Sequence, residues 1–200
     1  MDNPFILKDN TIRVLFTKEI LSYCLPFSCK NQDLDDFFSR DALLYDNELL
    51  GKTYAWLNLS NDKEIIAMAT LANDSIKLRM LSSSSKNRLQ RGVVNAKRGI
   101  NYPAVLIGRL GVSKDFRGKG LKIGSQIIDF LKDWFRSEDN KTGCRFIVVD
   151  AYNEERTLRF YESNGFKFLY KNEEEERQFL NLDKEEILQT RFMYFDLKQK

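Results

Sequence analysis

Histidine is absent from this chain of 200 residues. Histidine is the usual acid–base group near neutral pH and the commonest metal ligand. Its absence excludes Ser-His-Asp and Cys-His hydrolases as well as His-ligated zinc. Any catalysis must therefore depend on Tyr, carboxylates, Lys, a thiol, backbone amides or a bound cofactor.

Cysteine and long apolar runs are also scarce. The three cysteines are an odd number, which suits reduced thiols better than a disulfide framework. The longest uncharged apolar runs, such as 104–107 and 146–149, fall far short of the ~20 residues of a membrane helix. The N-terminal segment has an acidic second residue and no apolar signal sequence. We therefore expect a cytoplasmic protein that makes no membrane contact.

The rest of the composition, 42% hydrophobic and 30% charged, is typical of one globular domain. Hydrophobic periodicity predicts both strands and amphipathic helices. The predicted strands cover 12–16, 53–59, 64–71, 104–112, 145–150, 166–170 and 191–197. The predicted helices cover 33–50, 123–135 and 154–163, and the acidic run 173–176 is predicted to be an exposed loop. Strands followed by a β-α-β-α-β order indicate an α/β (α+β) sheet with helices packed on its faces.

Residues 74–103 form a basic segment, which we interpret as an insertion in a single domain of residues 1–200. Its net charge is +6 in a chain whose total is +3. The basic residues are Lys77, Arg79, Lys86, Arg88, Arg91, Lys97 and Arg98, against one acid, Asp74. Two interpretations stay open: a solvent-exposed surface segment (a solvated excursion of the chain) without a binding role, or a patch that contacts phosphates.

A basic, glycine-rich loop at 113–125 joins the buried strand 104–112 to the next helix. Backbone N–H groups and the helix dipole at such a junction favour an anion, and glycine lets a phosphate approach the main chain. Neither the Walker pattern G-x-x-x-x-G-K-[ST] nor the dinucleotide pattern G-x-G-x-x-G fits this loop. The loop therefore predicts phosphate binding of another type.

Three pieces of the sequence occur in a characteristic order: the strand 107–112, the loop 117–125, and 148–153 leading to F-Y-E-S-N-G-F at 160–166. Together they resemble the GNAT superfamily of acetyl-CoA-dependent N-acetyltransferases. Upstream, residues 27–38 and 52–54 are similar to the acetyltransferase toxins that modify aminoacyl-tRNA. The resemblance implies a mixed, mostly antiparallel sheet of about six to seven strands with helices on both faces.

The resemblance also implies which residues contact acetyl-CoA, and it implies a reaction that uses no metal. The implied cofactor contacts are Leu110, Gly111, Val112, Arg117, Gly118, Lys119, Gly120, Lys122, Ile123, Gly124, Ser125 and Asn153. The family's loop pattern, [RQ]-x-x-G-x-[GA], fits imperfectly from either Arg117 or Lys119, because Lys122 replaces a small residue in both registers. The apolar pair 127–128 favours the register that starts at Lys119, with the helix beginning near Ile123. For Asn153 the alternative is a capping role for the helix that follows.

The chemistry implied by the family can be matched to single residues. Tyr161 matches the tyrosine that the family uses as general acid, protonating the departing thiolate. No general base stands out, although Asp150 at the end of a strand is a candidate. An α-amine, with a pKa of ~7.7–8.0, is partly neutral at pH 7 without a base, whereas a lysine at ~10.4 is not. The missing base therefore favours an α-amine acceptor.

These observations predict acetyl transfer from acetyl-CoA to a primary amine of an unidentified acceptor. Two alternatives stay open. One is acetylation of the α-amine of aminoacyl-tRNA, with the basic segment contacting tRNA. The other is a non-catalytic CoA-binding or interaction module, which the departure at Lys122 leaves open. A homodimer is compatible with the sequence.

Overall fold

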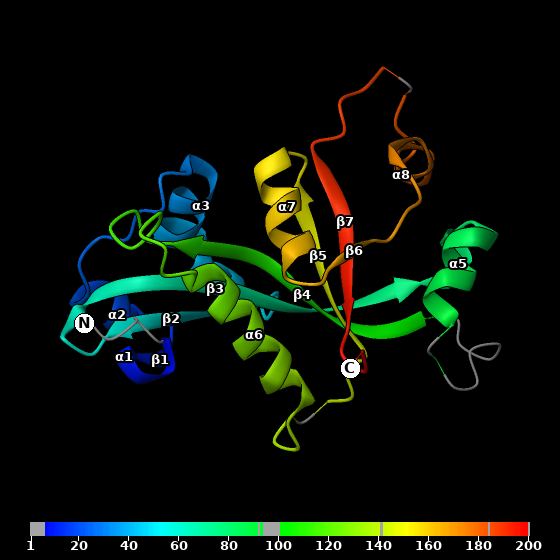
Figure 1. Cartoon of the computed structure of the whole chain (residues 1–200). Coiled ribbons are helices and arrows are strands. Elements are labelled where there is room, and N and C mark those ends of the chain that lie inside the picture. Colours follow the sequence, from blue (N-terminus) through cyan, green and yellow to red (C-terminus); the bar gives the residue numbers. More distant parts are fainter. Residues whose placement is uncertain (1–6, 92, 94–100, 141, 184, 200) are drawn as a thin grey trace. The chain divides into compact units, whose positions relative to one another are not determined.

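The computed structural model describes residues 7–91, 93, 101–140, 142–183 and 185–199. Its seven-stranded sheet has the order β1-β2-β3-β4-β5-β7-β6 (Figure 1). The pairing of β4 with β5 is parallel, whereas β1 with β2, β2 with β3, β5 with β7 and β6 with β7 are antiparallel. Helices flank the sheet, so the predicted α/β class and mixed, mostly antiparallel sheet are confirmed.

Most of the predicted elements have a counterpart in the structure. The strands are β1 (Thr11–Leu15), β2 (Lys52–Asn58), β3 (Asn61–Lys77), β4 (Asn101–Val112), β5 (Phe146–Tyr152), β6 (Lys167–Phe168) and β7 (Thr190–Asp196). The α-helices are α1 (Leu7–Asn10), α2 (Lys18–Tyr23), α3 (Gln32–Asp36), α4 (Ala42–Asn47), α5 (Ser83–Gln90), α6 (Ile123–Arg136), α7 (Glu155–Ser163) and α8 (Glu173–Leu180). A π-helical turn, η1 (Phe37–Asp41), and a 3-10 turn, η2 (Leu78–Met80), complete the list. None of the helices in this described part of the chain has the length and apolarity of a bilayer-spanning helix.

The chain divides into two compact units. Unit 1 comprises the chain up to Ala72 together with Ile107–Leu131, and unit 2 comprises Asn73–Leu106 and Lys132–Lys200. The strands β3 and β4 and the helix α6 contribute residues to both units.

The core of unit 1 differs from the sequence prediction over 33–50. A single helix was expected there, but a π turn separates α3 from α4. The amide of Ala42 donates to the carbonyl of Phe37, five residues earlier. Two neighbours in sequence within this turn, Phe37 and Phe38, both lie in the core, where each leaves 5% or less of its surface exposed. A π turn holds one residue more than a regular helical turn, so the side chains of α4 are out of phase with those of α3.

Unit 2 corrects the prediction for the acidic run 173–176. These residues form the first turn of α8 instead of a loop, and the Asn172 side chain caps the helix by accepting from the amide of Glu175. Carboxylates in a first turn are favoured by the helix dipole. Glu176 is only 2% exposed, so part of the run faces the protein interior.

The described part of the basic segment is ordered into secondary structure. The strand β3 continues to Lys77, beyond the predicted end at residue 71, and α5 follows with Ser82 as its cap. The guanidinium of Arg88 donates to the carbonyls of Phe168 (3.0 Å) and Leu169 (2.6 Å). Arg88 thus anchors α5 within unit 2, which a fully solvated excursion would not do. Lys97 and Arg98 lie outside the described residues.

Candidate active site

The glycine-rich loop follows β4 within unit 1 and leads directly into α6. It begins with a tight turn, in which the amides of Phe116 and Arg117 both donate to the carbonyl of Ser113. The first helical bond runs from the amide of Gln126 to the carbonyl of Lys122, at 3.0 Å. The helix α6 therefore begins at Ile123, as the register that starts at Lys119 predicted.

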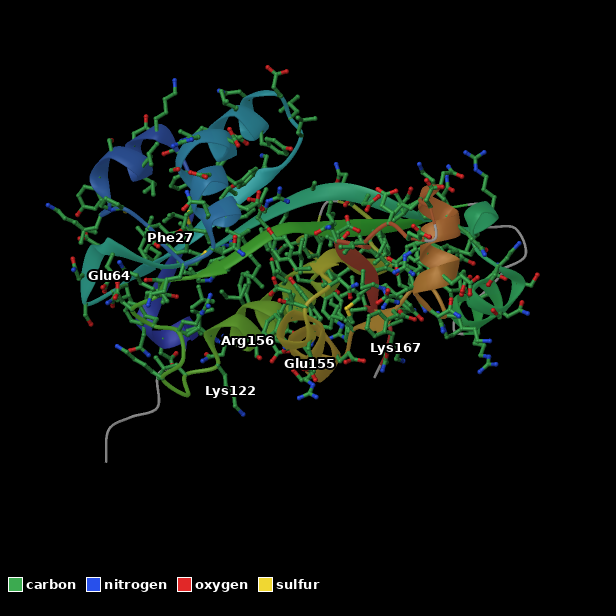
Figure 2. All side chains as sticks on the ribbon, turned by 90° about the horizontal axis from the view of Figure 1, so that it is seen from above. Phe27, Glu64, Lys122, Glu155, Arg156 and Lys167 are labelled. Atoms are coloured by element: carbon green, nitrogen blue, oxygen red, sulfur yellow. The ribbon has the colours of Figure 1, made fainter. Side chains whose placement is uncertain are left out.

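Three residues of this loop adopt positive φ angles: Gly118 (81°), Gly120 (73°) and Lys122 (50°). A Cβ built on Gly118 or Gly120 would have no neighbour within 4 Å. These glycines are thus needed for backbone conformation, and the space beside them is open to a ligand. Lys122 is exposed and its side chain points away from the ribbon (Figure 2).

Lys122 takes up a conformation in which glycine would be unstrained. The left-handed region costs an L-residue roughly 1–2 kcal/mol. Lys122 immediately precedes α6, where the family's middle glycine falls when the pattern starts at Lys119. The fully buried pair Ile127 and Ile128 also matches that register. Backbone conformation and helix burial therefore both favour the register from Lys119.

The start of the loop is braced by residues 28–29. Arg117 Nη1 donates to the carbonyl of Cys29 at 2.8 Å, and the amide of Lys114 donates to the carbonyl of Ser28 at 2.9 Å. Asp35 in turn accepts from Ser28 Oγ and from the amide of Cys29, both at 2.7 Å. Burial raises the pKa of Asp35, but these hydrogen bonds outweigh it and the net pKa lies below its ordinary value. Sequence reasoning missed Asp35, since no local pattern marks its partners.

The end of β4 carries the backbone expected to hold the cofactor arm. A Cβ on Gly111 would lie 3.0 Å from Phe38 Cε2 and 3.3 Å from the ring of Phe27. These two rings meet edge to face with centroids 5.5 Å apart. The strand therefore packs so closely on the aromatic cluster that a side chain at Gly111 requires the rings to move.

Tyr161 lies on α7 in unit 2, with 7% of its surface exposed. Its ring packs against Phe160 (5.1 Å between centroids) and Phe166 (5.3 Å). Burial, with a smaller contribution from Tyr152, raises the pKa of Tyr161 above its ordinary value. The phenol is therefore protonated throughout the neutral range, which is the state a proton donor needs.

Asn153 connects the end of β5 to the start of α7. Its Nδ2 donates to the carbonyl of Leu188 (2.9 Å) and to Glu173 Oε1 (3.2 Å), and its amide donates to the carbonyl of Gln189 (2.9 Å). The N-cap of α7 is Glu154, and no side chain caps it. The capping alternative for Asn153 is therefore wrong. Sequence reasoning did not find Glu173, although the acidic run after Asn172 is a helix-start signal.

The remaining predicted positions follow from these elements. Leu110, Gly111 and Val112 end β4, and Ile123, Gly124 and Ser125 form the first turn of α6, all in unit 1 with the loop. Asp150 is an exposed residue of β5 paired with Phe192. Burial first, and the charge of Asp150 among the smaller causes, raise the pKa of Glu176. The charge of Asp150 is therefore felt by the Glu176 carboxyl group, which is paired with Arg191.

Comparison with known proteins shows which family model and which solved structures the chain is similar to. Residues 85–168 match the model of the acetyltransferase (GNAT) domain. The fold is similar to AtaT in complex with acetyl-methionyl-tRNAfMet, with a TM-score of 0.63 and 16% identity over 94% of this chain and 96% of that one. It is also similar to AtaTR bound with acetyl-CoA (TM-score 0.62, 18% identity, 95% of each chain) and to a tyrosine-to-phenylalanine mutant of KacT (TM-score 0.64, 17% identity, 94% and 96%). Residues 85–168 therefore match an acetyltransferase (GNAT) domain, and the likeness to the solved structures shows that the chain shares their fold.

Proposed function

We propose that the chain transfers the acetyl group of acetyl-CoA to an α-amine by direct attack. The amine nitrogen bonds to the thioester carbonyl carbon, the carbon–sulfur bond breaks, and the CoA thiolate takes a proton from Tyr161. The amine gives up its own proton to water, and Tyr161 is reprotonated from solvent. The observation that carries the proposal is the loop with left-handed Gly118, Gly120 and Lys122 that opens directly onto α6.

The loop and β4 would hold the cofactor through their main chain. The backbone amides from Lys119 to Ser125 lie at the N-terminus of a 14-residue helix, where an anionic pyrophosphate is favoured. Lys119 and Lys122 add positive charge. The amides of 110–112 are assigned to the pantetheine arm and the thioester oxygen, which a polarised backbone N–H can stabilise without any particular side chain. We assign Arg117 to bracing the loop, because its guanidinium is bonded to Cys29.

A calorimetric titration with acetyl-CoA tests the binding step. We expect micromolar affinity, weakened when Lys122 is replaced by Gln and unchanged when the exposed Lys171 is replaced in the same way. Absence of binding at high micromolar acetyl-CoA would refute the proposal. Thiol release with an aminoacyl ester and with a lysine side-chain amine tests the acceptor, and faster release with the ester is expected. Binding without release for any amine would leave a CoA-binding module.

Aminoacyl-tRNA is a second candidate for the acceptor. The described basic segment presents exposed cations at Lys77, Arg79 and Arg91, and the similar protein AtaT is known in complex with acetyl-methionyl-tRNAfMet. Each phosphate contact should add about −0.7 to −0.9 to the slope of log K against log salt. Replacing these three residues by Ser should flatten the slope for tRNA and leave acetyl-CoA binding intact. An equal slope for both proteins would leave the small-amine acceptor as the better interpretation.

A further inference from the structure

A buried ion pair fixes the helix α8 to the strand β7. Arg191 Nε donates to Glu176 Oε2 at 2.7 Å, and the other oxygen of Glu176 accepts from the amide of Phe192. Both side chains are buried, at 10% exposure or less. The guanidinium also lies 4.6 Å from the centroid of Phe168. Since breaking a buried pair leaves an uncompensated charge, α8 is held firmly at this point.

The same arginine links α8 to the junction between β5 and α7. Arg191 Nη1 lies 3.6 Å from Glu173 Oε1, the oxygen that accepts from Asn153 Nδ2. The second oxygen of Glu173 accepts from Arg177 Nη2 at 2.8 Å. Glu173 is therefore held by two arginines while it binds the amide of Asn153.

Asn153 lies in the short connection between β5 and α7, where it can affect the orientation of the helix. It follows the last residue of β5, Tyr152, and precedes the N-cap residue Glu154. Because α7 has no side-chain cap of its own, the geometry of this turn depends on contacts from outside the helix. Tyr161 lies in the second turn of α7, so a change at the turn displaces its hydroxyl.

We propose that Glu173 is a positioning residue for the acetyl transfer. It holds the side-chain amide of Asn153 beside Arg191 and thereby fixes the orientation of α7, on which Tyr161 lies. This inference rests on the proposed role of Tyr161 as general acid. Glu173 itself takes no part in proton transfer. The predicted consequence is a defect in turnover without a defect in cofactor affinity.

The test compares Glu173→Gln with the matched control Glu174→Gln. Both variants lose one negative charge from the first turn of α8, but Glu174 is exposed. We expect Glu173→Gln to speed hydrogen exchange at the amides of 154–158 and to lower kcat roughly 10-fold to 100-fold, as misplacement by about 1 Å does. The KM for acetyl-CoA should stay within about twofold, because only the transition-state contact is lost. The control should match wild type in all three measurements.

An exchange of hydrogen-bonding roles gives an independent test. Asn153→Asp places two carboxylates together and should slow turnover further than Glu173→Gln does. Combining the two substitutions restores a donor–acceptor pair with the roles reversed, so the double variant should be faster than Asn153→Asp alone. A double variant no faster than Asn153→Asp would overturn the inference.

Hydrogen exchange separates failure of this inference from failure of the proposed function. Exchange in Glu173→Gln equal to that in Glu174→Gln overturns the inference, whether or not the protein is active. Faster exchange with wild-type kcat overturns it as well, because the turn would then not control catalysis. An inactive wild type with faster exchange in Glu173→Gln refutes the general-acid role of Tyr161 and, with it, the positioning role.

Discussion

Replacing Tyr161 by Phe is the most direct test of the proposed chemistry. The substitution removes only the hydroxyl oxygen, and the ring contacts with Phe160 and Phe166 at 5.1 and 5.3 Å remain. Because the ring is buried in an aromatic environment, the variant should fold and pack like wild type. Any large loss of turnover then reports on proton donation.

The size of the loss follows from the role assigned to the phenol. General acid catalysis typically contributes 10²–10⁴-fold, so kcat for thiol release should fall by roughly two to four orders of magnitude. Acetyl-CoA affinity should be nearly unchanged, because the hydroxyl acts in the transition state. The raised pKa of Tyr161 places its ionisation above its ordinary value of ~10, so wild-type kcat should show no alkaline loss from this group below pH 10.

The assay combines thiol release under saturating acetyl-CoA with a calorimetric measurement of acetyl-CoA binding. The control is Tyr45→Phe, which removes a hydroxyl from an exposed tyrosine of α4 and should leave kcat at the wild-type value. Turnover of Tyr161→Phe within threefold of wild type would show that Tyr161 is only a core aromatic. A loss of acetyl-CoA affinity equal to the loss of kcat would assign the hydroxyl to cofactor binding instead.

Three further substitutions test the loop and its support. Lys122→Gly should raise the free energy of unfolding by about 0.5–1 kcal/mol in urea denaturation. The strain energy that glycine avoids in the left-handed conformation exceeds the extra conformational entropy that glycine loses on folding. Unchanged or lower stability would show that Lys122 is not strained. Gly111→Ala should lower the free energy of unfolding by about 1–3 kcal/mol, because the added Cβ would press on Phe38. The control Gly143→Ala, whose Cβ has no neighbour within 4 Å, should leave that free energy unchanged. Equal effects of the two substitutions would contradict the packing argument. Asp35→Asn should lower the free energy of unfolding by about 1–3 kcal/mol at pH 7. Because the folded pKa is depressed, the difference from wild type should shrink as the pH falls below ~3.9 and be lost once the pH passes the folded pKa. A difference independent of pH would contradict the electrostatic argument.

Local periodicity was sufficient for the fold class and for the start of α6. The helix begins at Ile123 because Ile127 and Ile128 must be buried together, and that spacing is visible in sequence. The π turn was not predictable, because burial of both Phe37 and Phe38 depends on partners elsewhere in unit 1. The long strand β3 passes through Asn73 and Asp74, residues that strands disfavour, because tertiary packing overrides local propensity.

Long-range hydrogen bonds account for the largest differences at the candidate site. The acidic run 173–176 has the composition of a solvated loop, and long-range hydrogen bonds from Arg191 and from the amide of Phe192, 15 and 16 residues away, stabilise Glu176 in the interior. The side chain of Asn153 is likewise determined by Glu173 and Leu188, 20 and 35 residues away. Sequence motifs located the loop and Tyr161, but they do not contain the residues that support them.

The lack of histidine has a consequence for the pH dependence of the reaction. The pKa of Tyr161 is raised and that of Asp35 is lowered, so both groups keep one protonation state across the neutral range. The rise of kcat/KM with pH should then reflect deprotonation of the acceptor amine. With an α-amine acceptor the profile should level off near pH 8, whereas with a lysine acceptor it should climb beyond pH 10. Measured with acceptors of both kinds, a profile that levels off at the same pH for each would locate the titrating group on the enzyme and refute attack without a general base.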